Sequence, residues 1–255
     1  MNRVYVIAAN TFREAVRDRV LNSILFFAVI LLCLSLALKE MSIGDTAKVV
    51  RGVALGGTSL LAAIIAIFLG VGLVYKEIEK KTIYTLASKP MPRWQLLLGK
   101  YLGLWITLAA EVGLLTLFYT VVLATQQGMP SPGVYLAMVL LMVELSLLTA
   151  WATLFSTFAT PMTASAFSVC IYLIGHFADD LRLFGERAED GPFKTLVLLL
   201  YRVVPNLESF NIRAEAVHGV HVPWSEVLWS GAYGIGYTAA VLAVAMIIFE
   251  RRDFK

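Results

Sequence analysis

The chain has 255 residues, of which 59% are hydrophobic and only 15% are charged, and its net charge is +3. This composition excludes an ordinary soluble domain, in which about a quarter of the residues are charged, and it indicates a membrane protein. No basic stripe with interleaved aromatic residues suggests a nucleic-acid partner. The two cysteines, Cys33 and Cys170, both fall in apolar runs and are interpreted as small core residues rather than as a disulfide or zinc site.

The first expected element is an amphipathic helix within residues 1–19. Its apolar side chains recur at helical spacing, and its opposite face carries three arginines, which makes it too charged to cross a bilayer. We expect it to lie in the cytoplasmic membrane interface, close to anionic lipid headgroups; an ordinary cytoplasmic extension of the first span is the alternative. The apolar positions are Val4, Ile7, Ala8, Thr11, Phe12, Ala15 and Val16.

Six apolar runs follow, and each is close to the length of roughly 20 residues that an α-helix needs to cross a hydrocarbon core. Runs such as LLAAIIAIFLGVGLVY are apolar on every face, which excludes the alternating pattern of barrel strands. The sequence therefore predicts an all-α integral membrane protein with six transmembrane helices in one domain, residues 1–255. The runs are 20–38, 53–75, 96–124, 133–157, 162–178 and 226–249.

The basic residues predict how these helices are oriented. With both termini in the cytoplasm, 13 of the 21 basic residues lie on the cytoplasmic side of the inner membrane, as the positive-inside rule requires. The same orientation places residues 179–225 outside as one long loop. Within it, TLVLLLYRVV is too short to span, so we expect a re-entrant or outer-leaflet helix that ends before Pro205.

One cytoplasmic segment has an unusual order of residues, YKEIEKKTIYTLASKPMPRWQLLLGKYL at 75–102. An acidic pair, Glu77 and Glu79, begins a short helix at about 77–89, Pro90 ends that helix, and a basic stretch leads into the third span. A solvated loop is the alternative to a short helix lying across the mouth of the bundle.

These residues resemble the ABC-2 family of transporter permeases, through the pattern E-x-E-x-x-T-x-x-x-L-x-S-x-P-x-x-R-x-x-x-x-x-G-K that ends at Gly99 and Lys100. The resemblance extends to the N-terminal FREAVRDR, the six spans, the long loop before the last span and the basic tail ERRDFK. It implies that residues 77–89 form a coupling helix, which docks into a groove of a separate ATPase subunit. The residues that the resemblance assigns to this coupling are Glu77, Glu79, Thr82, Ile83, Leu86, Ser88, Pro90 and Arg93.

The resemblance also implies partners and a direction of transport. The chain has no G-x-x-x-x-G-K-[ST] phosphate-binding loop, so ATP and Mg are expected in the partner ATPase, in two copies. A second permease subunit, identical or different, is expected to complete the substrate path, and the family usually exports. No catalytic, cofactor-binding or metal-ligating residue is predicted in this chain.

Two acidic residues inside the spans, Glu111 and Glu144, are the candidates for a substrate path or a proton relay. The alternative is that they hydrogen-bond between helices and stabilise the bundle. His176, Asp179 and Asp180, with two further histidines in the long loop, could be metal ligands, but their spacing matches no tight ligand motif.

Two other functions stay open at this point. An ATP-independent secondary transporter or channel would predict paired repeats, broken helices or several midplane charges. A membrane enzyme would need a catalytic motif such as HExxH, which is missing from the sequence. The transported substrate is left open among lipid, glycan, peptide, drug and metal-related cargo.

Overall fold

The computed structural model describes residues 3–18, 22, 26, 29–30, 33, 46–79, 92–126, 130–188 and 191–251. All regular secondary structure in these ranges is helical, which confirms the expected all-α class. The elements are α1 (Arg3–Val16), α3 (Thr46–Glu79), α5 (Arg93–Gln126), α6 (Pro132–Ser156), α7 (Pro161–His176), α8 (Ala178–Arg187), α9 (Pro192–Val203), η1 (Glu208–Phe210), α10 (Arg213–His218) and α11 (Trp224–Arg251).

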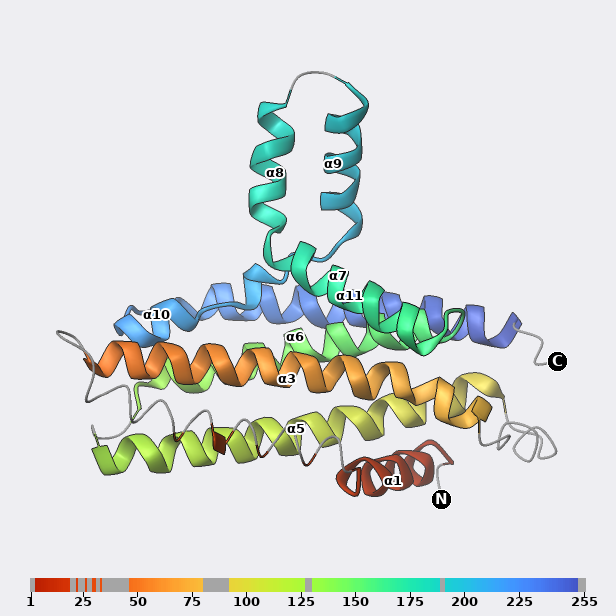
Figure 1. Cartoon of the computed structure of the whole chain (residues 1–255), viewed down its shortest axis with the longest axis horizontal. Helices are drawn as coiled ribbons and strands as arrows, with labels where there is room; N and C mark the ends of the chain where they lie inside the picture. The colour runs from red at the N-terminus through yellow and green to blue at the C-terminus, as the bar shows by residue number, and fades with distance from the viewer. Residues whose placement is uncertain are drawn as a thin grey trace.

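The long helices α3, α5, α6 and α11 run side by side along the long axis of the molecule (Figure 1). Helix α6 is central and contacts α3, α5, α7 and α11. Helix α3 ends and α5 begins at one end of this bundle, which we call the 80–91 end after the residues between them in the sequence. The opposite end, where α10 lies, is called the α10 end.

Four of these helices are long and apolar enough to cross a membrane: Arg51–Leu73, Arg93–Ala124, Pro132–Ser156 and Trp224–Arg251. They correspond to the second, third, fourth and sixth expected spans. The first expected span, 20–38, falls almost entirely outside the described residues and stays a prediction.

The fifth expected span, 162–178, differs from the structure. Helix α7 ends at His176, and the chain bends by 68° into α8, so this pair is a candidate span only if the two bent helices are counted as one. With 16 residues, α7 is about 24 Å long at 1.5 Å per residue, shorter than a hydrocarbon core of roughly 30 Å.

Several helix starts follow directly from proline positions. Pro132, Pro161 and Pro192 each occupy the first turn of a helix, where the missing amide hydrogen of proline would be unpaired in any case. Helix α9 ends at Val203, two residues before Pro205. At the end of α10, Gly219 adopts φ 70°, a left-handed conformation that glycine accepts without strain.

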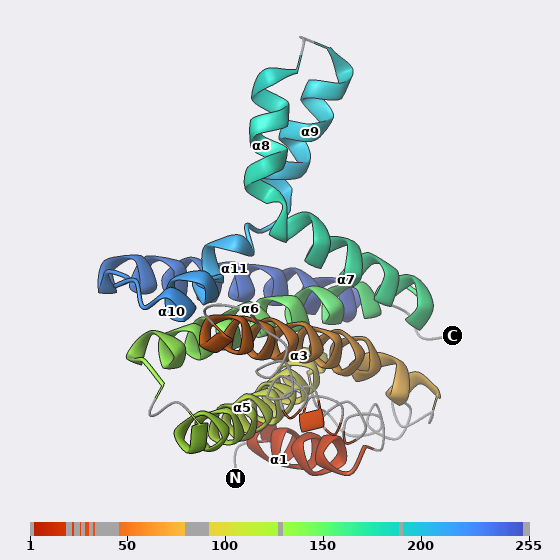
Figure 2. The same cartoon turned by 60° about the vertical axis from the view of Figure 1, so that its left-hand side comes forward.

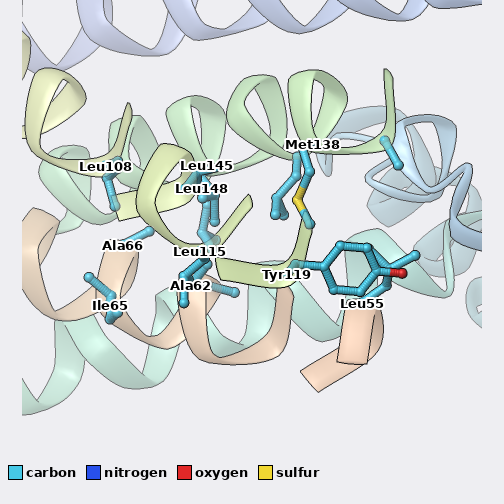
Figure 3. Close-up of a cluster of buried hydrophobic side chains, with 14 of the residues drawn as sticks. Leu55, Ala62, Ile65, Ala66, Leu108, Leu115, Tyr119, Met138, Leu145 and Leu148 are labelled. Atoms are coloured by element: carbon cyan, nitrogen blue, oxygen red, sulfur yellow. The ribbon is translucent and has the colours of Figure 1, made fainter. Parts of the chain in front are cut away.

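The main hydrophobic core lies between α3, α5 and α6 (Figure 3). Small residues of α3, such as Ala62 and Ala66, face larger ones of the other two helices, such as Leu115 and Leu148. Buried residues of α6 also belong to two further clusters, one with α5 and α11 towards the 80–91 end and one with residues 207–227. Helix α6 therefore contributes buried residues to all three hydrophobic clusters.

The long loop of the sequence interpretation contains more structure than its single expected helix. Helices α8 and α9 pair into a hairpin that stands away from the bundle in both views (Figures 1 and 2). The segment from Leu207 to His218 instead folds back onto α6 and α3, where Leu207, Phe210 and Ala216 are buried. Contacts of these apolar side chains with α6 and α3 fix the position of a segment that the sequence analysis assigned to the long loop.

Candidate functional site

Of the residues that the resemblance assigned to coupling, Glu77, Glu79 and Arg93 lie at the 80–91 end. Glu77 and Glu79 are in the last turn of α3, which continues past the expected end of the second span at residue 75. Arg93 is the first residue of α5. The others, Thr82, Ile83, Leu86, Ser88 and Pro90, lie outside the described residues, so the coupling helix stays a prediction.

Arg93 connects the start of α5 to the last helix. Its Nη1 donates a hydrogen bond to the backbone carbonyl oxygen of Glu250 in the last turn of α11, at 3.4 Å. The point at which the chain re-enters the bundle is therefore in contact with the end of α11, 157 residues away in sequence.

Helix α1 packs closely along the beginning of α5. A Cβ atom at Gly99 would lie 2.9 Å from Cβ of Ile7, and one at Gly103 would lie 2.6 Å from the carbonyl oxygen of Ala8. The Gly99 to Gly103 spacing therefore permits a close helix approach, with α1 as the packing partner. The face of α1 that contacts α5 is the predicted apolar face.

Other glycines of the chain differ in how closely neighbouring atoms approach them. A Cβ atom at Gly52, Gly56, Gly231 or Gly236 would meet nothing within 4 Å, whereas one at Gly234 would lie 2.3 Å from Cγ1 of Val143. Gly234 therefore allows α11 to approach α6. The remaining four mark open surface within the described part of this subunit.

Replacing the glycine of the tightest approach should release α1. We expect Gly103→Leu to displace α1, because the new side chain overlaps the backbone of Ala8; overpacking of this kind costs about 1–3 kcal/mol. That cost corresponds to a roughly 5- to 150-fold larger undocked population. The rate of tryptic cleavage at the exposed Arg13 measures it, since cleavage follows local opening.

The matched control for this substitution is Gly113→Leu in the same helix, where a Cβ atom meets nothing within 4 Å. This control should be cleaved at the wild-type rate. Equal cleavage of the two variants would mean that α1 does not depend on the Gly103 contact.

The two acidic candidates within the bundle have different surroundings. Glu111 of α5 is 7% exposed, and its Oε1 has no hydrogen-bond partner among the described residues. Glu144 of α6 is 3% exposed, and its Oε1 lies 3.6 Å from Nε2 of His176 on α7. The structure does not place Glu111 in contact with Glu144 and His176.

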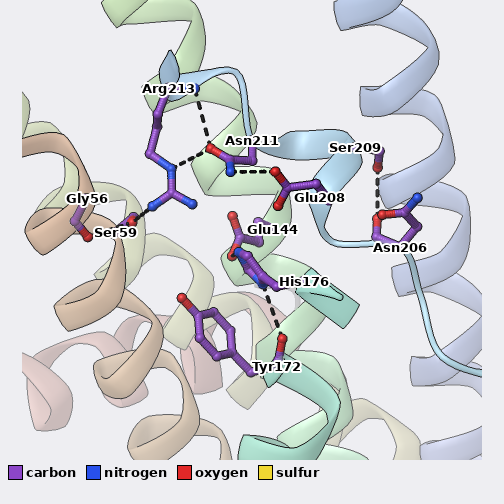
Figure 4. A network of polar contacts seen from close by, with 10 residues as sticks. All are labelled: Gly56, Ser59, Glu144, Tyr172, His176, Asn206, Glu208, Ser209, Asn211 and Arg213. Carbon is purple, nitrogen blue, oxygen red and sulfur yellow. Dashed lines mark hydrogen bonds and ion pairs between the residues drawn. The ribbon is translucent and has the colours of Figure 1, made fainter. Parts of the chain in front are cut away.

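Glu144 and His176 belong to a polar group that we call the Glu144 cluster, which consists of Ser59, Glu144, Tyr172, His176, Glu208, Asn211 and Arg213 (Figure 4). Arg213 donates hydrogen bonds to two members of the cluster. The guanidinium Nε donates to Oδ1 of Asn211 at 2.6 Å, and Nη1 donates to Oγ of Ser59 on α3. Asn211 Nδ2 in turn donates to Oε1 of Glu208 at 2.8 Å.

The imidazole of His176 completes the cluster on α7. Its Nδ1 lies 3.2 Å from the carbonyl oxygen of Tyr172, and the two rings lie 4.5 Å apart. Glu144 and Arg213 line one cavity of about 10 Å³, which has room for about one water molecule. Burial raises the pKa of Glu208 above its ordinary value, while the hydrogen bond from Asn211 and the charge of Arg213 act in the opposite direction.

The carboxylate of Glu144 thus contacts α7, a neighbouring helix, and its role, in a substrate path or in stabilising the bundle, stays a prediction. The sequence interpretation missed Ser59, Tyr172, Glu208, Asn211 and Arg213. A usable signal was the apolar residues spaced around Arg213 in LESFNIRAEAV, a pattern that favours a segment packed against a core.

The sequence interpretation considered His176, Asp179 and Asp180 as metal ligands. Within the described ranges, no three His, Cys, Asp or Glu side chains converge where they could hold a metal ion. His176 faces Glu144, and Asp179 Oδ1 accepts a hydrogen bond from Asn206 Nδ2 at 3.0 Å.

The family model described as ABC-2 family transporter protein matches residues 5–254, nearly the whole chain. The chain belongs to the ABC-2 family. No curated protein matched the sequence in a separate comparison. The family confirms the resemblance seen at residues 77–100 and makes the chain a multi-pass membrane permease of an ABC transporter.

Family membership bears on two further expectations. ABC-2 permeases are membrane transport components and are generally not catalytic, and their family implies association with an ABC ATPase subunit. In this ABC-2 permease, the 80–91 end is the part of the bundle to which the expected coupling residues belong, and the Glu144 cluster lies towards the other end, between α3, α6, α7 and α10.

Proposed function

We propose that this permease is the transmembrane subunit of an ATP-driven exporter, and that it forms the substrate pathway as a dimer. The observation that carries the proposal is the family match over residues 5–254. The missing phosphate-binding loop supports a separate ATPase, which binds ATP and Mg and is present in two copies.

Coupling takes place at residues 77–89 in this proposal, where Ile83 and Leu86 enter a groove of the ATPase. Both helices that flank the segment, α3 and α5, belong to the main core, so a displacement of the segment moves the bundle itself. Because packed helices move as rigid bodies, such displacement would be transmitted without unfolding.

Two contacts support transmission beyond α3 and α5. Helix α1 is packed on α5 at Gly99 and Gly103, so the two helices move together. The hydrogen bond from Arg93 to the carbonyl of Glu250 extends the connection to α11. ATP-driven closure of the ATPase pair would thus act on four helices, α1, α3, α5 and α11, from one docking point.

The proposed orientation places the 80–91 end, with both chain termini, in the cytoplasm and the α10 end outside the inner membrane. The 13 basic residues assigned to the cytoplasmic side support it. The exposed Trp224 and Trp229 near the start of α11 are suited to the opposite membrane interface, since tryptophan is enriched there.

Purification from native membranes in mild detergent tests this function. We expect an ABC ATPase to co-purify in equal number with the permease, and Ser88→Cys, in a chain without Cys33 and Cys170, to react with an impermeant thiol reagent only from the side that carries the ATPase. A permease that elutes with no ATPase, or that transports substrate alone in liposomes, would refute the proposal.

A further inference from the structure

The hairpin of α8 and α9 makes few contacts with the rest of the subunit. Its helices pack on each other through Gly185 and Val197, and among the described residues the hairpin meets the bundle near its base. We call this hairpin the arm. It stands across the long axis of the bundle in both views (Figures 1 and 2).

The depth of the arm follows from its contacts with α11. Tyr237 donates a hydrogen bond to the carbonyl oxygen of Val203, and Tyr233 accepts one from the backbone N–H of Asn206 at 3.1 Å. These tyrosines lie nine and thirteen residues beyond Trp224, which is about 13–20 Å along the helix. If Trp224 lies at the outer membrane interface, as the proposed orientation has it, the arm leaves the bundle about 13–20 Å deeper in the membrane than Trp224.

The two helices of the arm expose different surfaces at this depth. Along α9, the exposed apolar residues Phe193, Leu196 and Leu199 form a stripe that is compatible with lipid. The exposed face of α8 is mixed: Asp180, Leu183 and Arg187 follow one another at helical spacing, opposite the face of Ala178 and Gly185 that is buried.

Other charges of α8 are already paired within the arm. Arg182 forms an ion pair with Glu186 at 2.8 Å and stacks over the ring of Tyr201, and Asp179 is hydrogen-bonded to Asn206. Neither the side chain of Asp180 nor that of Arg187 forms an ion pair or hydrogen bond with another residue in the described part of the chain. Charges are costly against lipid, so this face requires protein or water.

The two-fold symmetry of a membrane dimer is compatible with the order of Asp180 and Arg187 along the exposed face of α8. A two-fold axis along the membrane normal reverses every direction in the membrane plane, so the arms of two copies run antiparallel. Asp180 and Arg187 are equally far from the middle of that face, near Leu183. An antiparallel pair of α8 helices therefore brings each acid opposite a base.

We propose that the exposed face of α8 is half of a two-fold interface with a second copy of this chain. In it, Asp180 pairs with Arg187 of the partner subunit, Leu183 packs on Leu183 of the partner subunit, and α9 faces lipid. This inference rests on the dimer of the proposed function and adds the surface that forms it.

Disulfide crosslinking in native membranes tests the interface, in a background that lacks the two exposed cysteines, Cys33 and Cys170. We expect Leu183→Cys to form a homodimeric disulfide on mild oxidation. The matched control is Leu196→Cys on α9, which is exposed to a similar extent, 54% against 49%, and should stay monomeric. No disulfide at position 183, or equal crosslinking at both positions, would overturn the proposal.

Charge reversal tests the pairing itself. Asp180→Arg or Arg187→Asp alone should lower the yield of the Leu183→Cys disulfide by about tenfold, because each places like charges opposite one another. The double reversal should restore the yield. Unchanged yields in the single variants, or no restoration in the double variant, would refute the pairing.

The test separates this inference from the proposed function. If an ATPase co-purifies but no disulfide forms at position 183, only the interface is wrong, whereas a missing ATPase contradicts the proposed function. A disulfide to a different permease chain, identified by its mass, would also overturn the inference of a second copy.

Discussion

Leu86→Asp is expected to abolish coupled ATP hydrolysis while leaving membrane insertion and dimerisation intact. If Leu86 enters a groove of the ATPase, its burial contributes roughly 1.5–3 kcal/mol, which the substitution removes. The new carboxylate adds the cost of leaving water, so the total loss exceeds that range. Pull-down of the ATPase and substrate-stimulated turnover measure the effect.

Two further variants control this experiment. Lys80→Ala should be nearly neutral, because exposed ion pairs are typically worth about 0–1 kcal/mol. Leu86→Gly should fall between the two, since it removes the contact and weakens the helix by about 1 kcal/mol relative to alanine. Normal complex formation and full coupled activity of Leu86→Asp would show that residues 77–89 are a solvated loop.

Arg213→Met is expected to lower the free energy of unfolding by about 3 kcal/mol. Removing the charged member of a partly buried polar network leaves the remaining polar groups without compensation. Here Asn211 and Ser59 lose their shared donor, and Glu208 loses the neighbouring guanidinium. Thermal and denaturant unfolding of the detergent-purified permease measure the loss.

The chain offers matched variants for this prediction as well. Arg202→Met removes an exposed arginine of α9 and should change stability little. Arg213→Lys keeps the charge but replaces a planar, forked donor, so it should recover only part of the loss. If Arg213→Met and Arg202→Met unfold alike, the Glu144 cluster does not stabilise the bundle.

The features that could be predicted from the sequence are those that depend on neighbouring residues. The length of an apolar run determines whether a helix can span, so α3, α5, α6 and α11 were predictable. The apolar face of α1 and the end of α9 before Pro205 were predictable for the same reason, because periodicity and proline act locally.

The surroundings of the candidate site depended on contacts between distant segments. Arg213 and Ser59 are 154 residues apart, and no local pattern indicates that they meet. The bend after His176 and the separation of Glu111 from the Glu144 cluster likewise follow from which helix faces pack together. The sequence by itself determined which segments are helical and apolar, because those properties are local. Only the tertiary structure decided which polar groups share an environment, because that depends on the packing of the whole bundle.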